Sequence, residues 1–189
     1  ISPVSAATPV SGTISSPETW TLANSPYTVT GNVLVSSGVT LTIEAGVTVK
    51  FDPDKGIQVL GAVVARGTSG QPVVFTSAAS SPAAGDWAFI KFFDSATDAS
   101  YDSGDNYLAG SILQHCEVRY GGGGGASAAI EVDLAAPSID YCTIADNQIG
   151  GIYASNPTNL RVSNSTITSN SGVGNSISTS CGGLTVNGG

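Results

Sequence analysis

The clearest pattern in the sequence is an eight-residue segment, Ser111-Ile-Leu-Gln-His-Cys-Glu-Val118, which recurs twice further along the chain. It aligns with Pro137-Ser-Ile-Asp-Tyr-Cys-Thr-Ile144 and then with Leu160-Arg-Val-Ser-Asn-Ser-Thr-Ile167, at offsets of 26 and 23 residues. A second segment recurs after each of these copies, as Ala129-Ile-Glu-Val132, Gly151-Ile-Tyr-Ala154 and Gly172-Val-Gly174. Self-similarity with a period of about 20 to 50 residues is typical of solenoids and propellers.

The segments between these repeats indicate short β-strands. From Tyr27 to Val186, apolar runs rich in Val, Ile and Thr alternate with Gly, Asn, Asp, Ser and Pro, which are strand and turn signals. A propeller blade needs about 40 residues for its four strands. The shorter period instead favours an all-β parallel β-helix, in which each coil stacks on the previous one at about 4.8 Å.

Strand pleating predicts which side chains face the core. Cys142 and Ile144 point inward and Thr143 outward, because alternate residues of a strand face opposite sides. The same alignment places Cys116 inside, stacked on Cys142 at about 4.8 Å. That distance fits either two free buried thiols or a disulfide, and Cys181 is then either an exposed reactive thiol or paired outside this chain.

Composition excludes several classes of protein. The 189 residues carry 6 basic and 14 acidic side chains, a net charge of −8. So few scattered Lys and Arg residues cannot form the basic surface of a nucleic-acid binder. No apolar run approaches the roughly 20 residues of a membrane span. The absence of Met predicts a chain processed or excised from a longer one. The small residues of Ile1-Ser-Pro-Val-Ser-Ala-Ala7 fit either the end of a signal peptide or an arbitrary boundary.

The first half of the chain carries motifs of a known family. The segments are Gly31-Asn-Val-Leu-Val-Ser-Ser-Gly-Val-Thr-Leu-Thr-Ile-Glu-Ala-Gly-Val-Thr-Val-Lys-Phe51, Val59-Leu-Gly-Ala-Val-Val-Ala-Arg-Gly-Thr-Ser-Gly-Gln-Pro-Val-Val-Phe-Thr-Ser77 and Gly85-Asp-Trp-Ala-Phe-Ile90. From about Thr13 onward the chain resembles the right-handed parallel β-helix repeat family of secreted or cell-surface microbial proteins. The resemblance implies a shape and a secreted or surface location. The family includes adhesin-like proteins and parts of carbohydrate-active enzymes.

Together, the repeats and the resemblance predict the domain organisation. We expect an N-terminal segment and cap over residues 1–30, followed by a right-handed parallel β-helix of about five to six coils over residues 31–189. The stretch 94–110 is longer and more acidic than the other connections, so it is predicted to be an inserted loop.

The sequence does not favour a catalytic role. Enzymes of this fold that act on acidic polysaccharides pair aspartates on one coil with His, Arg or Lys on later coils, and no such signature is found. The single His115 aligns with Tyr141 and Asn164, so it is interpreted as a turn residue. Glu131 and Asp133 are predicted to form a solvated outer face, because they alternate with apolar residues.

A set of outward-facing polar residues is the candidate ligand site. They are Glu117, Arg119, Tyr120 and Asp140. Stacking could bring Glu117 within about 5 to 9.5 Å of Asp140 or Asp146, the separation that glycoside hydrolysis requires. Three tyrosines are candidate platforms for a sugar ring: Tyr120, Tyr141 and Tyr153.

Four aspartates cluster in residues 93–106. Oxygen ligands at that density can bind calcium. One hypothesis is that Asp98, Asp102 and Asp105 hold a Ca²⁺ ion, although their spacing is not that of an EF-hand. The alternative is an acidic surface loop without metal.

Two functions remain open from the sequence. The first is an extracellular structural or adhesive module of a microbial surface protein, which would bind a surface glycan or protein and could also build filaments or an envelope. Head-to-tail self-association would follow if the C-terminal coil is uncapped, because exposed strand edges accept further strands. The alternative is a carbohydrate-binding or polysaccharide-cleaving module that uses the outer face of the solenoid.

Overall fold

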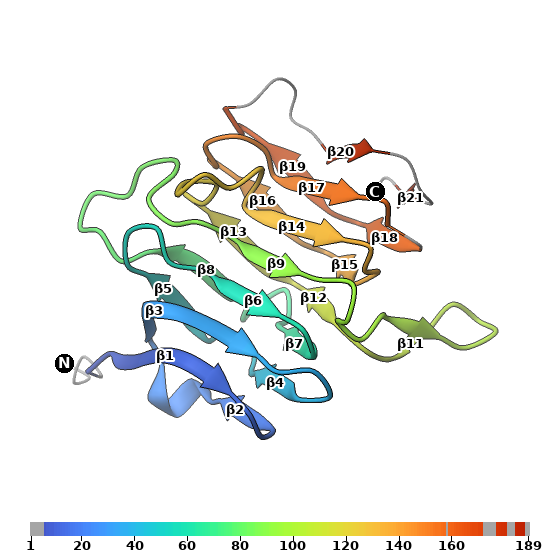
Figure 1. The fold of residues 1–189 in the computed structure, drawn as a ribbon, viewed down its shortest axis with the longest axis horizontal. Coiled ribbons are helices and arrows are strands. Elements are labelled where there is room, and N and C mark those ends of the chain that lie inside the picture. Colours follow the sequence, from blue (N-terminus) through green and yellow to red (C-terminus); the bar gives the residue numbers. More distant parts are fainter. Residues whose placement is uncertain (1–5, 158, 172–176, 181–183, 188–189) are drawn as a thin grey trace.

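The computed structural model describes residues 6–157, 159–171, 177–180 and 184–187, with side chains described as far as residue 171. The described strands wind into a parallel β-helix with three faces (Figure 1). The first face contains β5 (Thr48–Phe51), β8 (Val73–Ser77), β13 (Cys116–Arg119), β16 (Thr143–Ala145) and β19 (Thr166–Thr168). The second contains β6 (Ile57–Val59), β9 (Ile90–Phe92), β14 (Ile130–Asp133), β17 (Ile152–Ser155) and β20 (Ile177–Ser180). The third contains β2 (Glu18–Trp20), β4 (Thr40–Ile43), β7 (Ala62–Arg66), β12 (Ile112–Gln114), β15 (Ser138–Asp140), β18 (Leu160–Ser163) and β21 (Leu184–Asn187).

The N-terminal residues form the first coil of the helix. β1 (Thr8–Ile14) pairs in parallel with β3 (Tyr27–Val35), and a short 3₁₀ helix, Leu22–Asn24, follows β2. β3 bends around a corner, because its first half pairs with β5 and its second half with β6. The boundary expected at residue 30 therefore falls inside a strand. The third face has one strand per coil in a seven-stranded sheet, so the helix has about seven turns rather than five or six.

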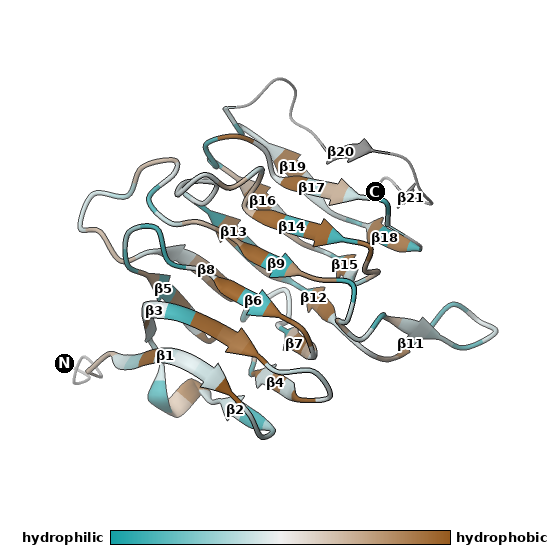
Figure 2. Cartoon of the chain, in the orientation of Figure 1, coloured by the Kyte–Doolittle hydropathy of each residue, from teal (hydrophilic) through white to brown (hydrophobic). Residues whose placement is uncertain are grey.

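The core is built from columns of like side chains. On the second face, Ile57, Ile90, Ile130 and Ile152 lie in register, one per coil, and all are buried. Figure 2 shows brown hydrophobic segments along β6, β9 and β14, interrupted by teal hydrophilic ones. Burying these columns supplies the hydrophobic stabilisation that no single coil could provide.

The register of the second half is the one that the repeats predict. Glu117 pairs with Thr143 and Thr143 with Thr166, while Ile130 pairs with Ile152. The third copy of the second repeat is an exception. Gly172, Val173 and Gly174 lie outside the described residues, and the strand that pairs with β17 is β20, which begins at Ile177.

At the corners of the later coils, residues other than glycine adopt the left-handed backbone conformation, with positive φ. His115, Tyr141 and Asn164 have φ values of 48°, 51° and 49° and occupy equivalent positions between the third and first faces. The aromatic rings of His115 and Tyr141 stack, with centroids 4.8 Å apart. His115 is thus a turn residue, and each corner directs its side chain away from the core.

Candidate functional site

A surface hollow lies between the third face and the segment inserted at 94–110. This segment contains an antiparallel hairpin of β10 (Ser100–Tyr101) and β11 (Tyr107–Ala109), which projects from the solenoid (Figure 1). The hollow has a volume of about 570 Å³. The third face contributes Arg66, Ile112, Gln114, Ser138, Asp140, Tyr141, Arg161, Ser163 and Asn164, and the hairpin contributes Tyr101, Asp105, Asn106 and Tyr107. We call it the hairpin groove.

The floor of the groove is a ladder of polar side chains that runs across four coils. Arg66, Gln114, Asp140 and Ser163 are in register on β7, β12, β15 and β18. The Arg66 Nε donates a hydrogen bond to Gln114 Oε1 (2.9 Å), and Gln114 Nε2 donates to Asp140 Oδ2 (3.1 Å). Asp140 Oδ1 accepts two more bonds, from Ser163 Oγ (3.0 Å) and Asn164 Nδ2 (2.9 Å).

Two arginines attach the hairpin to this floor. Arg161 Nη1 lies 3.0 Å from Asp105 Oδ1, and its guanidinium carbon lies 3.9 Å from the centroid of the Tyr101 ring. The Arg66 guanidinium lies over Tyr107, 5.4 Å from the ring centroid. Such cation–π contacts are favourable when the cation lies within about 6 Å of the ring. They hold the hairpin as a wall of the groove.

The two hairpin tyrosines differ in their polar contacts. Tyr107 Oη donates a hydrogen bond to the Gly110 carbonyl oxygen (2.7 Å). Partial burial raises the pKa of Tyr107, while the nearby positive charge of Arg66 acts in the opposite direction. The Tyr101 hydroxyl oxygen is buried and, among the described atoms, has no hydrogen-bond partner. Buried hydroxyls in proteins usually have one.

An aromatic ring borders the same groove. Tyr141 is 52% exposed and its ring stacks on His115. Unlike Tyr101 and Tyr107, it carries no guanidinium over its face in the described contacts. Of the three tyrosines predicted from the sequence as sugar platforms, Tyr141 is the one that lines the groove.

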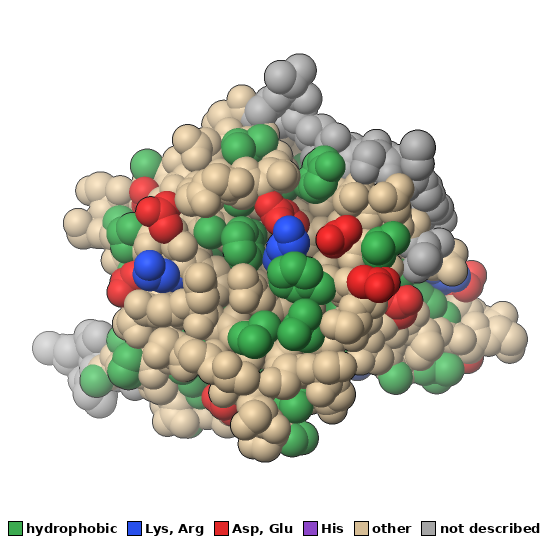
Figure 3. Space-filling view, viewed as in Figure 1, with side chains coloured by type: hydrophobic (Ala, Val, Ile, Leu, Met, Phe, Trp, Pro, Cys, Tyr) green, Lys and Arg blue, Asp and Glu red, His purple; other side chains and the backbone are tan. Residues whose placement is uncertain are grey.

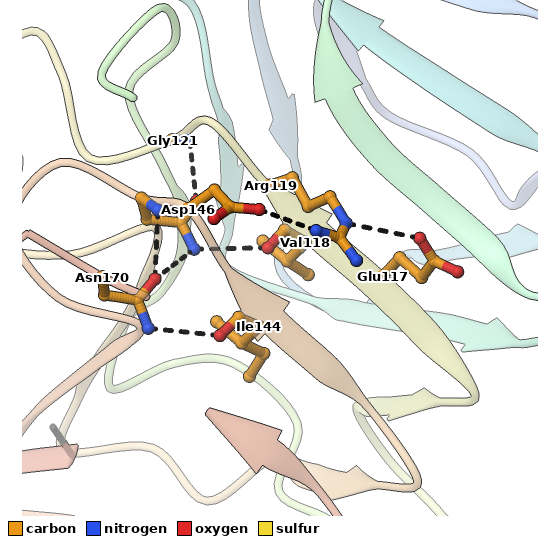
Figure 4. A network of polar contacts seen from close by, with 8 residues as sticks. Glu117, Val118, Arg119, Gly121, Ile144, Asp146 and Asn170 are labelled. Carbon is orange, nitrogen blue, oxygen red and sulfur yellow. Dashed lines mark hydrogen bonds and ion pairs between the residues drawn. The ribbon is translucent and has the colours of Figure 1, made fainter. Parts of the chain in front are cut away.

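The four predicted ligand residues do not form one site. Glu117 and Arg119 lie on β13 in the first face, with Tyr120 at the corner that follows, whereas Asp140 lies on β15 in the third face. Arg119 contacts both Glu117 (Nε to Oε2, 3.5 Å) and Asp146 (Nη1 to Oδ2, 2.7 Å), as Figure 4 shows. The predicted pair Glu117 and Asp146 is thus bridged by a cation, and the pair Glu117 and Asp140 is separated.

Beside this ion pair lies a buried asparagine ladder. Asn147 Oδ1 accepts from the Gly121 N–H (2.8 Å), and Asn147 Nδ2 donates to the Val118 carbonyl (3.2 Å) and to Asn170 Oδ1 (2.8 Å). In the next coil, Asn170 Nδ2 donates to the Ile144 carbonyl (3.1 Å). The ladder satisfies backbone groups where the chain leaves the first face.

The three aspartates predicted to bind calcium have separate partners. Asp98 accepts from the Ala136 N–H (2.7 Å), and Asp105 pairs with Arg161. Asp102 accepts from the side chain and N–H of Asn106, and these hydrogen bonds lower its pKa. Across the residues that the structure describes, no group of three His, Cys, Asp or Glu side chains is arranged to hold a metal ion.

On the second face, the structure corrects the sequence prediction for Glu131. Glu131 is buried, with 6% of its surface exposed, instead of solvated. It pairs with Lys91 (Nζ to Oε2, 3.0 Å) on β9 and accepts a hydrogen bond from the Ser127 N–H in the loop above it. Elsewhere on this side of the molecule, charged side chains are few and scattered (Figure 3). The pair borders a shallow hollow of about 180 Å³.

Cys116 and Cys142 are free and buried, the first of the two alternatives. Burial raises the pKa of Cys116 well above its usual value, and the neighbouring Cys142 adds to this shift. Their sulfur atoms lie near the carbonyl oxygens of Ala65 (3.6 Å) and Leu113 (3.2 Å). Cys181 lies outside the described residues.

Sequence reasoning missed most residues of the groove, among them Arg66, Tyr101, Tyr107, Gln114 and Arg161. The aligned repeats place Gln114, Asp140 and Ser163 at equivalent positions, so the sequence alignment alone could have predicted this part of the ladder. The sequence gives only a weak indication of the hairpin wall, namely two tyrosines within an acidic insertion.

Comparisons with known proteins agree with the fold. Residues 12–127 match the model of the pectate-lyase like beta helix domain, and residues 97–189 match that of the right handed beta helix region. A curated relative, Protein bark beetle of Drosophila melanogaster, is 44% identical over 54 residues, which are 29% of this chain and 2% of that protein. No solved structure matches significantly. Within the described residues, no helix has the length and apolarity that a membrane span requires. Since the first match covers more than half of its length, the chain belongs to the pectate-lyase-like β-helix domain family.

Proposed function

We propose that this chain is an extracellular carbohydrate-binding module that holds a glycan in the hairpin groove. The observation that carries the proposal is the groove itself, in which a hairpin encloses a polar ladder spanning four coils. Ligand sites are typically concave and place a few polar groups so that they fix the orientation of the ligand. A secreted or cell-surface location, expected from the family resemblance, is part of this proposal.

The chemistry of the lining suits a hydroxyl-rich ligand. Gln114 and Asn164 offer amide groups, Asp140 offers carboxylate oxygens, and Ser163 offers a hydroxyl. Tyr141 adds an exposed apolar ring face next to these groups, against which the C–H groups of a sugar can pack. A polymer of sugars would meet the same kinds of contact on successive coils.

The proposal is binding rather than cleavage. Hydrolysis of a glycosidic bond needs one carboxyl group that donates a proton and a second that acts as base or nucleophile. In the groove, Asp140 accepts hydrogen bonds from three side chains and Asp105 is paired with Arg161. Both carboxylates thus act as acceptors that hold the wall and floor in place.

The test is glycan binding by the wild type and two tyrosine variants, measured on a glycan array and then by calorimetry. Tyr141→Asn removes the ring but retains a residue that suits positive φ, as Asn164 does at the next corner. We expect it to weaken binding at least 10-fold. Tyr153→Ser, on the second face, serves as the matched control and should not change the affinity. Equal loss in both variants, or no glycan bound by the wild type, would contradict the proposal.

A structural or adhesive role is the second candidate. Among the described residues, β1 and β2 each pair with a strand on one side only, so the first coil offers strand edges to another molecule. Head-to-tail association through this edge would lengthen the rod. Light scattering tests it: a mass that rises with protein concentration supports association, and a monomer at high concentration contradicts it.

A further inference from the structure

The charges of the hairpin groove cancel. Its described lining contains two cations, Arg66 and Arg161, and two carboxylates, Asp105 and Asp140. The whole chain carries a net charge of −8. A polyanionic ligand would therefore approach a negatively charged protein and find no surplus of positive charge in the groove.

Both cations are also already engaged. Arg161 contacts Asp105 at 3.0 Å and lies against the Tyr101 ring at 3.9 Å. Arg66 donates through Nε to Gln114 and lies over the Tyr107 ring. An acidic sugar would compete with Asp105 for Arg161, and at Arg66 it would find only the Nη groups, because Nε already donates to Gln114.

The groups that remain match uncharged hydroxyls. The Tyr101 hydroxyl oxygen is buried beside the groove without a described partner, so a sugar hydroxyl could donate to it and accept from it once a small shift of the hairpin exposes it. The ladder repeats once per coil, about 4.8 Å apart, which is similar to the length of one pyranose unit. A glycan that lies along the solenoid axis would thus meet Gln114, Asp140 and Ser163 with successive sugars.

We propose that the hairpin groove selects an uncharged polysaccharide chain, aligned with the solenoid axis, over a polyuronate. This inference rests on the proposed carbohydrate-binding function and specifies its ligand class. Affinity would come from sugar hydroxyls that pair with Tyr101 and add to the hydrogen bonds of the polar ladder. Discrimination would come from the groove's lack of surplus positive charge, which leaves the carboxylates of a polyuronate uncompensated.

The test compares two classes of hexasaccharide by calorimetry at 20 and 200 mM NaCl. The neutral probes are cellohexaose, xylohexaose and mannohexaose, and the acidic probes are hexagalacturonate and hexamannuronate. We expect a neutral probe to bind with a Kd that changes less than 2-fold with salt, and the acidic probes to bind at least 10-fold more weakly. Tighter, salt-sensitive binding of an acidic probe would overturn the inference and leave the proposed function intact. If no probe of either class binds, the proposed function fails and the inference fails with it.

Two variants test the stated contacts. Tyr101→Phe should weaken binding of the neutral probe about 5-fold without changing the melting temperature, because the hydroxyl has no described partner in the free protein. Tyr107→Phe is the matched control, which shows the effect of losing a hydroxyl that does have a partner. Loss of its hydrogen bond to Gly110 should loosen the hairpin. Asp105→Asn should release Arg161 and raise affinity for hexagalacturonate at least 5-fold. Unchanged binding in Tyr101→Phe and Asp105→Asn would overturn the inference.

Discussion

Arg161 Nη1 lies 3.0 Å from Asp105 Oδ1, although 56 residues separate them in the chain. The contact joins β18 of the third face to the tip of an inserted hairpin, two coils away along the solenoid. The same guanidinium packs on Tyr101. Arg161 thus helps to fix the position of the wall that turns a flat sheet face into a groove.

The first prediction concerns this attachment. Arg161→Ala should destabilise the hairpin locally by about 1–2 kcal/mol, the sum expected of an exposed ion pair and an exposed cation–π contact. Hydrogen exchange should therefore quicken at β10 and β11, while the melting temperature of the solenoid changes little. Asp105→Asn removes the ion pair and keeps the stacking on Tyr101, so it should have a smaller effect. Unchanged exchange in Arg161→Ala would mean that Arg161 does not hold the hairpin in place.

The solenoid could be predicted from local pattern because a parallel β-helix repeats the same contacts in each coil. Once Cys116, Cys142 and Ser165 were aligned, the pairing of Glu117 with Thr143 and of Gln114 with Asp140 followed. Each coil constrains the next, so a sequence offset translates directly into a position in space.

The groove could not be predicted in the same way, since it depends on where an insertion folds. Nothing in the sequence near Asp105 indicates that Arg161 will contact it. The predicted exposure of Glu131 was wrong for a related reason. Strand alternation correctly placed its side chain on the outside, but the loop containing Ser127 and the side chain of Lys91 cover it. Pattern predicts the direction of a side chain, whereas long connections decide what lies above it.

The second prediction tests the asparagine ladder. Asn147→Ala should lower the free energy of unfolding by about 2–4 kcal/mol, because the Gly121 N–H and the Val118 carbonyl would lose buried partners. Chemical denaturation measures the change. Gln148→Ala, at the exposed neighbouring position, is the control and should stay within about 0.5 kcal/mol of the wild type. A loss of similar size in both would place the effect in the loop rather than in the ladder.

The third prediction concerns the tight corner between β6 and β7. A Cβ atom on Gly61 would lie 2.2 Å from the carbonyl oxygens of Ser36 and Val39, so Gly61→Ala must displace the backbone of the adjacent coil. We expect it to cost about 1–3 kcal/mol, as overpacking does. Gly70 has no atom within 4 Å of such a Cβ, so Gly70→Ala should be tolerated. Equal melting temperatures for the two variants would show that the corner adapts freely.

The last prediction concerns the buried thiol of Cys116. Its pKa is raised in the folded chain, so above the usual thiol pKa of about 8.5 the unfolded chain loses this proton while the folded chain keeps it. The free energy of unfolding should then fall as the pH rises, by at most about 1.4 kcal/mol per pH unit, until the raised pKa is reached. Urea denaturation between pH 7.5 and 9.5 measures this slope.

Cys116→Ala provides the comparison for that slope. The variant should be less stable than the wild type at pH 7.5, since it leaves a cavity in the core, but its stability should decline less steeply up to pH 9.5. Other titrating groups, Cys181 included, are common to both proteins and cancel in the difference. Parallel pH profiles would mean that Cys116 ionises as readily in the folded chain as in the unfolded one. That result would be incompatible with a thiol only 1% exposed within the stacked core.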